Sequence, residues 1–159
     1  MSHAYKAIRN YGKDILRDQG FRDSGNSVQH GTVSVRQHCI SVASHALAIS
    51  RFLPIKFCER ELVRGALLHD YFLYDWHDKE VKPEHILVFY KMHGFVHPRI
   101  ALANARRKFE LTKREEDIIA KHMWPLTVKP PVCREAWVVT MADKYCSLLE
   151  TLRIHKGRC

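Results

Sequence analysis

A short apolar run that ends in a histidine and an aspartate constrains this chain most strongly. The run Gly65–Leu68 has the composition of a buried helix, and His69 and Asp70 follow it directly. Adjacent helical residues point about 100° apart, so both side chains reach one point only where the helix ends against a cavity. The pair is therefore either a pair of metal ligands or the polar cap of a helix end. The remaining sequence bears on that choice.

Length and composition indicate one globular domain. The chain has 159 residues, of which 46% are hydrophobic and 27% charged, and no apolar run reaches the ~18–20 residues that span a bilayer. We therefore expect no membrane segment. The N-terminus lacks the layout of a signal peptide, and the five cysteines include no C-x-x-C pair. These features favour a reducing cytoplasm and argue against a disulfide framework or a thiolate zinc site.

The formal net charge of +9 favours an anionic partner. The basic residues are dispersed and form no long block, so the charge indicates a small phosphorylated substrate more than a nucleic-acid-binding arm. Binding of nucleic acid stays open as a possible alternative.

Apolar spacing predicts an all-α, single-domain helical bundle of about six to seven helices. Residues 1–33 read as a covering helix over 3–19, ended near Gly20, and a loop over 21–33. The working part of the chain would span 34–155, with Gly94 ending one helix and Pro98 opening the next. Its predicted helices cover 34–52, 56–70, 83–92, a segment from 98, 113–122 and 133–153.

Local signals mark several of these helices. Ser34 is placed to cap the first helix of this part, and Thr112 with Glu115 forms a capping-box pattern. The last helix has many apolar residues that we expect in the core, including Trp137, Met141, Tyr145 and Leu148, and they surround Asp143. A carboxylate is costly to bury unpaired, so Asp143 is the least ordinary residue of that helix.

Six residues lie on, or at the end of, predicted apolar helix faces and carry side chains that bind metals. His38 shares its face with His45, the nearest competitor for the same role. Four imidazoles and two carboxylates suit two divalent ions, and six protein ligands leave positions open for water and substrate, as in catalytic sites. The candidates are His38, His69, Asp70, His97, His122 and Asp143.

In this order the six residues resemble the HD superfamily of metal-dependent phosphohydrolases, and more closely its H…HD…H…H…D members. The resemblance covers roughly residues 34–152. It implies that His38, His69, Asp70 and Asp143 bind one divalent metal, with Asp70 bridging to a second metal held by His97 and His122. It also implies hydrolysis of a phosphate mono- or diester, in a nucleotide-like or other small phosphorylated metabolite, by a metal-activated water.

The resemblance leaves the metals (Mn, Fe, Co, Ni, Zn or Mg) and the substrate open. Tyr71-Phe72-Leu73 follows the dyad, where cyclic-dinucleotide phosphodiesterases have Ile-Gly-Lys and nucleoside monophosphatases have a glutamate at the position of Leu73. Besides Asp70, the candidate catalytic groups are cations beside the ligands, which would neutralise charge on phosphoryl oxygens. They are Lys144 and Arg99 first, then Lys121 and Arg36; Asp75, His77 and His93 are candidates for orienting the ligands.

Two further functions fit the same residues. A few HD relatives use this six-ligand arrangement to activate dioxygen at two irons, and iron content with oxygen uptake would distinguish them. A non-catalytic module that senses a nucleotide is the other alternative, although none of the six ligand positions is missing.

Overall fold

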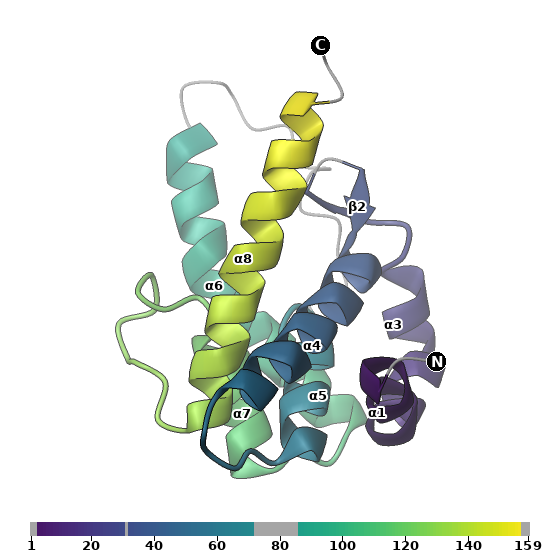
Figure 1. Ribbon diagram of the computed structural model, residues 1–159. Helices are drawn as coiled ribbons and strands as arrows, with labels where there is room; N and C mark the ends of the chain where they lie inside the picture. The colour runs from purple at the N-terminus through teal and green to yellow at the C-terminus, as the bar shows by residue number, and fades with distance from the viewer. Residues whose placement is uncertain (1–2, 31, 72–85, 157–159) are drawn as a thin grey trace.

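The computed structural model describes residues 3–30, 32–71 and 86–156 (Figure 1). Within these ranges the chain forms eight helices and one two-stranded hairpin, so the expected all-α class is confirmed, with more helices than the six or seven expected. No helix in this part of the chain is long and apolar enough to cross a membrane. In chain order the elements are α1 (His3–Tyr11), α2 (Lys13–Arg17), α3 (Gln19–Asp23), β1 (Val28–His30), β2 (Val33–Ser34), α4 (Val35–Phe52), α5 (Glu59–Leu68), α6 (Ile86–Lys108), α7 (Lys113–Lys121) and α8 (Arg134–Lys156).

The N-terminal part differs from the single helix and loop expected there. Three short helices replace the helix over 3–19, and the chain breaks at Gly12, where an added Cβ would lie 2.3 Å from the Leu67 side chain. This close approach to α5 explains the break. Asp18 then caps α3 by accepting a hydrogen bond of 3.1 Å from the Phe21 amide. The expected loop over 21–33 instead contains the end of α3 and the antiparallel hairpin β1–β2.

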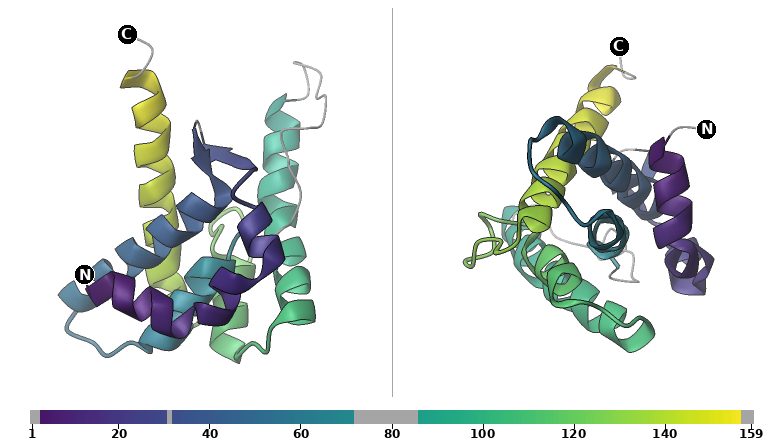
Figure 2. Two further views of the ribbon diagram at one scale, coloured as in Figure 1. Left: turned by 90° about the vertical axis from the view of Figure 1, so that its right-hand side faces the viewer. Right: turned by 60° about the horizontal axis from the view of Figure 1, so that its bottom comes forward.

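Helices α4 and α5 form the centre of the bundle. Both pack against α8, α5 also packs against α7, and α1 covers the two central helices from outside (Figure 2). The predicted caps are confirmed: the Ser34 and Thr112 side chains accept from backbone amides three residues on, and the side chains of Gln37 and Glu115 accept from the capping residues' own amides. These caps set where α4 and α7 begin, and so set the position of His38 and His122 along them.

Helices α5 and α7 approach each other at Gly65. A Cβ built on this residue would lie 2.5–2.9 Å from three atoms of the Ile118 side chain, closer than real Cβ contacts come. A residue without a side chain therefore lets the two backbones approach. Their closeness brings the C-terminal ends of α5 and α7 together.

Helix α6 has no break between residues 92 and 98, where the sequence predicted one. It runs without interruption from Ile86 to Lys108 and includes both Gly94 and Pro98. Proline has no amide hydrogen, so the helix lacks one backbone bond at this point, and local signals therefore favoured a stop. Packing outweighs that loss, because Ala101 and Ala105 of the same helix are fully buried in the core.

Helix α8 contributes fewer large side chains to the core than the sequence predicted. Its buried apolar residues include Val139 and Ala142, whereas four large side chains that we expected inside face outward. Because the helix is apolar on nearly every side, periodicity alone could not choose the inner face. The exposed fractions are 37% for Trp137, 48% for Met141, 48% for Tyr145 and 58% for Leu148.

Candidate metal centre

Five helices contribute to one buried cluster of histidines and aspartates, which we call the His-Asp cluster. Each of its six residues is at most 6% exposed. His38 comes from the first turns of α4, His97 from α6 and Asp143 from α8, while His69 and His122 are the residues on which α5 and α7 end. The cluster consists of His38, His69, Asp70, His97, His122 and Asp143.

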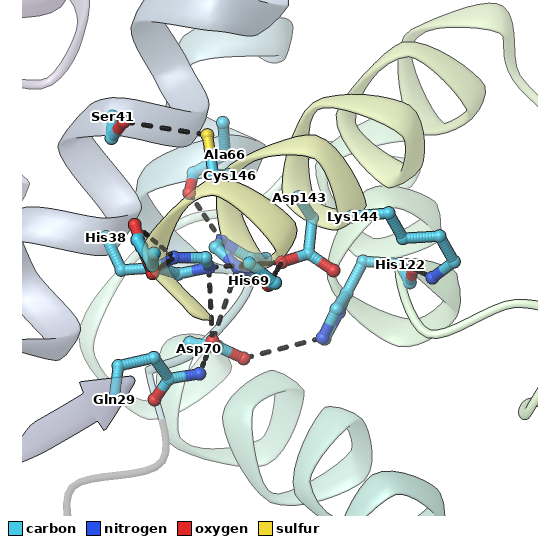
Figure 3. Close-up of polar contacts among 12 residues, drawn as sticks. Gln29, His38, Ser41, Ala66, His69, Asp70, His122, Asp143, Lys144 and Cys146 are labelled. Atoms are coloured by element: carbon cyan, nitrogen blue, oxygen red, sulfur yellow. Dashed lines mark hydrogen bonds and ion pairs between the residues drawn. The ribbon is translucent and has the colours of Figure 1, made fainter. Parts of the chain in front are cut away.

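One half of the cluster gathers around Asp143 and one oxygen of Asp70 (Figure 3). The Asp143 Oδ1 atom lies 3.0 Å from Nε2 of His38 and 3.7 Å from Nε2 of His69. The Asp70 Oδ2 atom lies 3.3 Å from Nε2 of His69 and 4.0 Å from Nε2 of His38. Two imidazoles and two carboxylates thus point at the same small volume.

The other half gathers around the second oxygen of Asp70. Its Oδ1 atom lies 3.2 Å from Nε2 of His97 and 3.4 Å from Nε2 of His122, and these two nitrogens are 2.9 Å apart. The two oxygens of Asp70 therefore face different pairs of histidines. Asp70 is the residue that joins the two halves.

Hydrogen bonds at Nδ1 orient three of the imidazoles. His69 donates from Nδ1 to the Ala66 carbonyl at 2.7 Å, and His122 donates in the same way to the Ile119 carbonyl at 2.8 Å, because a carbonyl can only accept. His38 places Nδ1 2.9 Å from the Glu150 carboxylate. Each ring thereby directs Nε2, the nitrogen that would bind a metal, into the cluster.

Sequence reasoning missed two residues that support the cluster. Glu150 is 6% exposed and orients His38, and Gln29 of β1 donates from Nε2 to Asp70 Oδ2 at 2.7 Å. Glu150 was detectable, because it lies seven residues after Asp143 and so shares its helix face. Gln29 was not, because it lies in a segment expected to be an irregular loop and reaches Asp70 only through the fold.

Charges within the cluster compensate one another when no metal is present. Burial alone would lower the pKa of His38, but hydrogen bonds to Asp143 and Glu150 raise it to about 10. Burial likewise opposes protonation of His69, yet the charge of Asp70 raises the pKa of this imidazole well above its ordinary value. The pKa values of Asp70 and Asp143 move the other way: burial would raise them, but the neighbouring imidazoles hold both below their ordinary value.

His122 differs from these two histidines. Burial is the main reason that its pKa is lowered, and the positive charge of His69 adds to the effect, although Asp70 opposes it. The ring is therefore neutral at pH 7, with a lone pair on Nε2. A neutral imidazole is the form that binds divalent metals.

The residues fit a metal centre by an observation independent of any family. Nε2 of His69 and Oδ1 of Asp70 are buried atoms without a hydrogen bond in the described part of the chain, and groups of this kind normally have one. In addition, each of two groups of three residues offers three ligand atoms that all lie within 4.8 Å of one another. At metal–ligand distances of about 2.1 Å, two ligands of one ion lie about 3.0–3.4 Å apart, close to the separations seen here. The groups are His38, His69 and Asp143, and His69, Asp70 and His122.

The structure separates His45 from the cluster. Its Nδ1 bonds the Ser41 carbonyl at 2.9 Å and lies 3.4 Å from the Cys146 sulfur, about two helical turns after His38. Its ring also contacts Tyr145, with ring centroids 5.2 Å apart. His38, not His45, is the histidine of α4 that reaches the two carboxylates.

The cations expected to meet a phosphate lie around the cluster rather than in it. Lys144 is exposed, with Nζ 3.5 Å from the His122 carbonyl oxygen, and Arg99 is exposed on α6. Lys121 pairs with Asp117, and Arg36 has a buried Nε without a hydrogen-bond partner among the described residues. Asp75, His77 and the side chain of His93, expected to orient ligands, lie outside the described part, as do Phe72 and Leu73.

The chain belongs to the HD domain family. The model of this family matches residues 35–148, which include all six members of the His-Asp cluster and most of the chain. The HD domain suggests a superfamily of the metal-dependent phosphohydrolase type, and its members are commonly hydrolases. No curated protein and no solved structure shows significant similarity to the chain.

Proposed function

We propose that the protein is a metal-dependent phosphohydrolase that holds two divalent ions in the His-Asp cluster. The observation that carries the proposal is the position of Asp70, whose two oxygens face two separate pairs of histidines at 3.2–4.0 Å. A carboxylate that bridges two ions needs this arrangement. His38, His69 and Asp143 would hold one ion, and His97 and His122 the other.

Ions bound there would lower the pKa of a water molecule and neutralise charge on the phosphoryl oxygens of a substrate. The protein's own contribution is orientation. Backbone carbonyls hold the rings of His69 and His122, Glu150 holds His38, and Gln29 holds one oxygen of Asp70. Ligands fixed in this way are preorganised for the charge that develops during phosphoryl transfer.

The substrate would be a small phosphate mono- or diester, nucleotide-like or another phosphorylated metabolite, attracted by the net charge of +9. We keep Lys144 and Arg99 as the cations that would meet the phosphate, because they adjoin Asp143 and His97 in the sequence. The absence of a C-x-x-C pair favours a cytoplasmic location for this activity.

The test is metal analysis of protein purified without chelator, followed by hydrolysis assays. Phosphomonoesters and phosphodiesters, including nucleotides, are offered with Mn, Fe, Co, Ni, Zn and Mg in turn. We expect about two ions per chain and hydrolysis of at least one ester class. Bound iron with oxygen uptake and no hydrolysis would favour the dioxygen-activating alternative instead.

Two histidines of α4 provide a matched pair of variants. His38→Ala should abolish metal binding in one half of the cluster and reduce hydrolysis at least about a hundredfold. His45→Ala, seven residues away on the same helix, should keep both. Hydrolysis that survives His38→Ala at equal purity would place the reaction outside the cluster.

A further inference from the structure

Helix α8 presents a continuous apolar stripe to solvent. Five large side chains are between 37% and 58% exposed, and with 100° per residue their positions fall within about 80° of the helix circumference. We call this set the α8 stripe. It consists of Trp137, Met141, Tyr145, Leu148 and Leu152.

No described element covers this side of α8. Its C-terminal half extends beyond α4 in Figure 1 and stands at one edge of the molecule in the left view of Figure 2. The inner face of the same helix carries its buried acidic residues Glu135, Asp143 and Glu150. The inner face also buries apolar residues such as Val139 and Ala142, so α8 is apolar on both sides, unlike an ordinary surface helix, and its exposed apolar side indicates a partner.

The charges around the α8 stripe permit close contact with a second apolar helix. Lys144 lies at the edge of the stripe, and its Nζ extends sideways to the His122 carbonyl, 3.5 Å away. Thr151, a polar residue without charge, lies on the same edge seven residues after Lys144. The ring of Trp137 rests edge-on against Trp124, with centroids 5.0 Å apart, which holds this end of the stripe in place.

We propose that the α8 stripe is the interface of a two-fold symmetric dimer, in which α8 packs antiparallel against α8 of a second copy. Four of the five stripe residues match their own reverse about a point between residues 144 and 145, and Tyr145 then lies opposite Lys144 of the second copy. In that register Trp137 meets Leu152 of the second copy, and Met141 meets Leu148. A self-complementary patch of this kind is what an isologous interface requires.

The area is sufficient for a stable pair. Side chains of this size have about 150–250 Å² of surface, so the exposed fractions correspond to roughly 500 Å² per copy, or roughly 1,000 Å² for two. That value is at the threshold for a specific interface before any neighbouring residue is counted. Tryptophan, tyrosine and methionine are also the residue types enriched at such interfaces.

The experiment is sedimentation or light scattering of the full chain over a range of micromolar concentrations. We expect a mass twice the 18.6 kDa of one chain. Met141→Glu and Leu148→Lys should each weaken association about a hundredfold, because each places a charge against an apolar residue of the other copy. Tyr5→Glu is the matched control: Tyr5 is 48% exposed, as Met141 is, and lies on α1, which packs on α4 and α5, so its substitution should change nothing.

Mixing the two monomeric variants tests both the second copy and its direction. The carboxylate introduced by Met141→Glu in one chain then faces the ammonium group introduced by Leu148→Lys in the other. At the opposite end of the interface, the native contact between Met141 and Leu148 still forms. The mixture should therefore associate at least about tenfold more tightly than either variant alone. A monomeric wild type, a dimer unaffected by Met141→Glu, or a mixture that stays monomeric would each overturn the proposal.

Discussion

Two buried polar clusters connect α5 with α7, and they differ in one respect. In the first, Arg64 donates from Nε to Glu115 at 2.9 Å and from Nη1 to Asp14 at 2.7 Å, while the second oxygen of Glu115 accepts from the Thr112 amide. None of these side chains has a buried polar atom without a partner. In the His-Asp cluster, by contrast, Nε2 of His69 and Oδ1 of Asp70 have no hydrogen bond to any residue that the structure describes.

This difference indicates a purely structural role for the Arg64 cluster and a metal-binding role for the His-Asp cluster. A buried charge is tolerated when its partners satisfy it completely, as in the Arg64 cluster. The His-Asp cluster buries converging imidazoles and carboxylates and leaves some of their atoms without hydrogen bonds, and a bound cation can take the place of the imidazole protons as the partner of the carboxylates. Four predictions distinguish the roles of the two clusters.

The largest effect is expected at Asp70. Asp70→Ala removes the oxygens that join the two halves of the His-Asp cluster, so metal content should fall sharply and hydrolysis should drop at least about a thousandfold. The chain should still melt cooperatively, because a core of this size is stable by about 5–15 kcal/mol without a metal. Metal analysis, a hydrolysis assay and a thermal melt measure this. Full activity in the variant would mean that the cluster is not the catalytic centre.

Glu115→Ala should have the opposite profile. It leaves the buried Arg64 without its main partner and the Thr112 amide without an acceptor, so the free energy of unfolding should fall by about 3–5 kcal/mol. Urea denaturation measures the loss. Replacing both charges together, Arg64→Met with Glu115→Leu, should recover part of it, because no unpaired charge is left inside. If Glu115→Ala lost metal while keeping its stability, the two clusters would not be separable in this way.

Glu150 should have an intermediate effect. Glu150→Ala removes the group that orients His38, and losses of this kind lower metal affinity about 10–100-fold. Glu150→Gln keeps an oxygen that can accept from Nδ1, so its loss should be clearly smaller. Calorimetric titration with metal compares the two variants. Equal losses would indicate that the carboxylate acts through its charge and not through ring orientation.

The smallest effect is a pH dependence of the metal-free protein. The pKa of His38 is raised to about 10 in the folded state, above the ordinary value of 6.5, so its contribution is fully present below pH 6.5 and is lost as the pH rises toward 10. Asp14 of the other cluster has a lowered pKa, so its contribution is lost only as the pH falls below about 4.

Urea denaturation of metal-free protein between pH 6.5 and 8.5 measures the first of these effects. The free energy of unfolding should fall by about 1.4 kcal/mol per pH unit for each histidine that is protonated in the folded state and deprotonated in the unfolded state. Glu115→Ala should leave this slope unchanged and His38→Ala should reduce it. A free energy of unfolding that rises over this range would contradict the sign.

Helical periodicity placed some of the candidate ligands, and the resemblance to the HD superfamily related all six to one another. His38 shares its helix face with Val35 and Val42, and His122 follows Ile118 and Ile119 at the end of a capped helix. The structure brings these residues together with His69, Asp70, His97 and Asp143, while their role as ligands stays a prediction.

The parts that could not be predicted depend on contacts between distant segments. The chain bends at Gly12 because Leu67 lies against it, and α6 continues through Pro98 because residues further along are buried. Gln29 reaches Asp70 from a hairpin that has no periodic signal. In α8 the apolar pattern surrounds the helix, so only the positions of Asp143 and Glu150 reveal which side is inside.

Gly65 carries a consequence for how this family can diverge. The separation of α5 and α7 sets the distance between the dyad His69-Asp70 and His122, and that separation exists because residue 65 has no side chain to meet Ile118. A single methyl group at position 65 would disturb the centre without touching any ligand. Among relatives, residue 65 can therefore gain a side chain only where residue 118 becomes smaller, and the two positions should change together over evolutionary time.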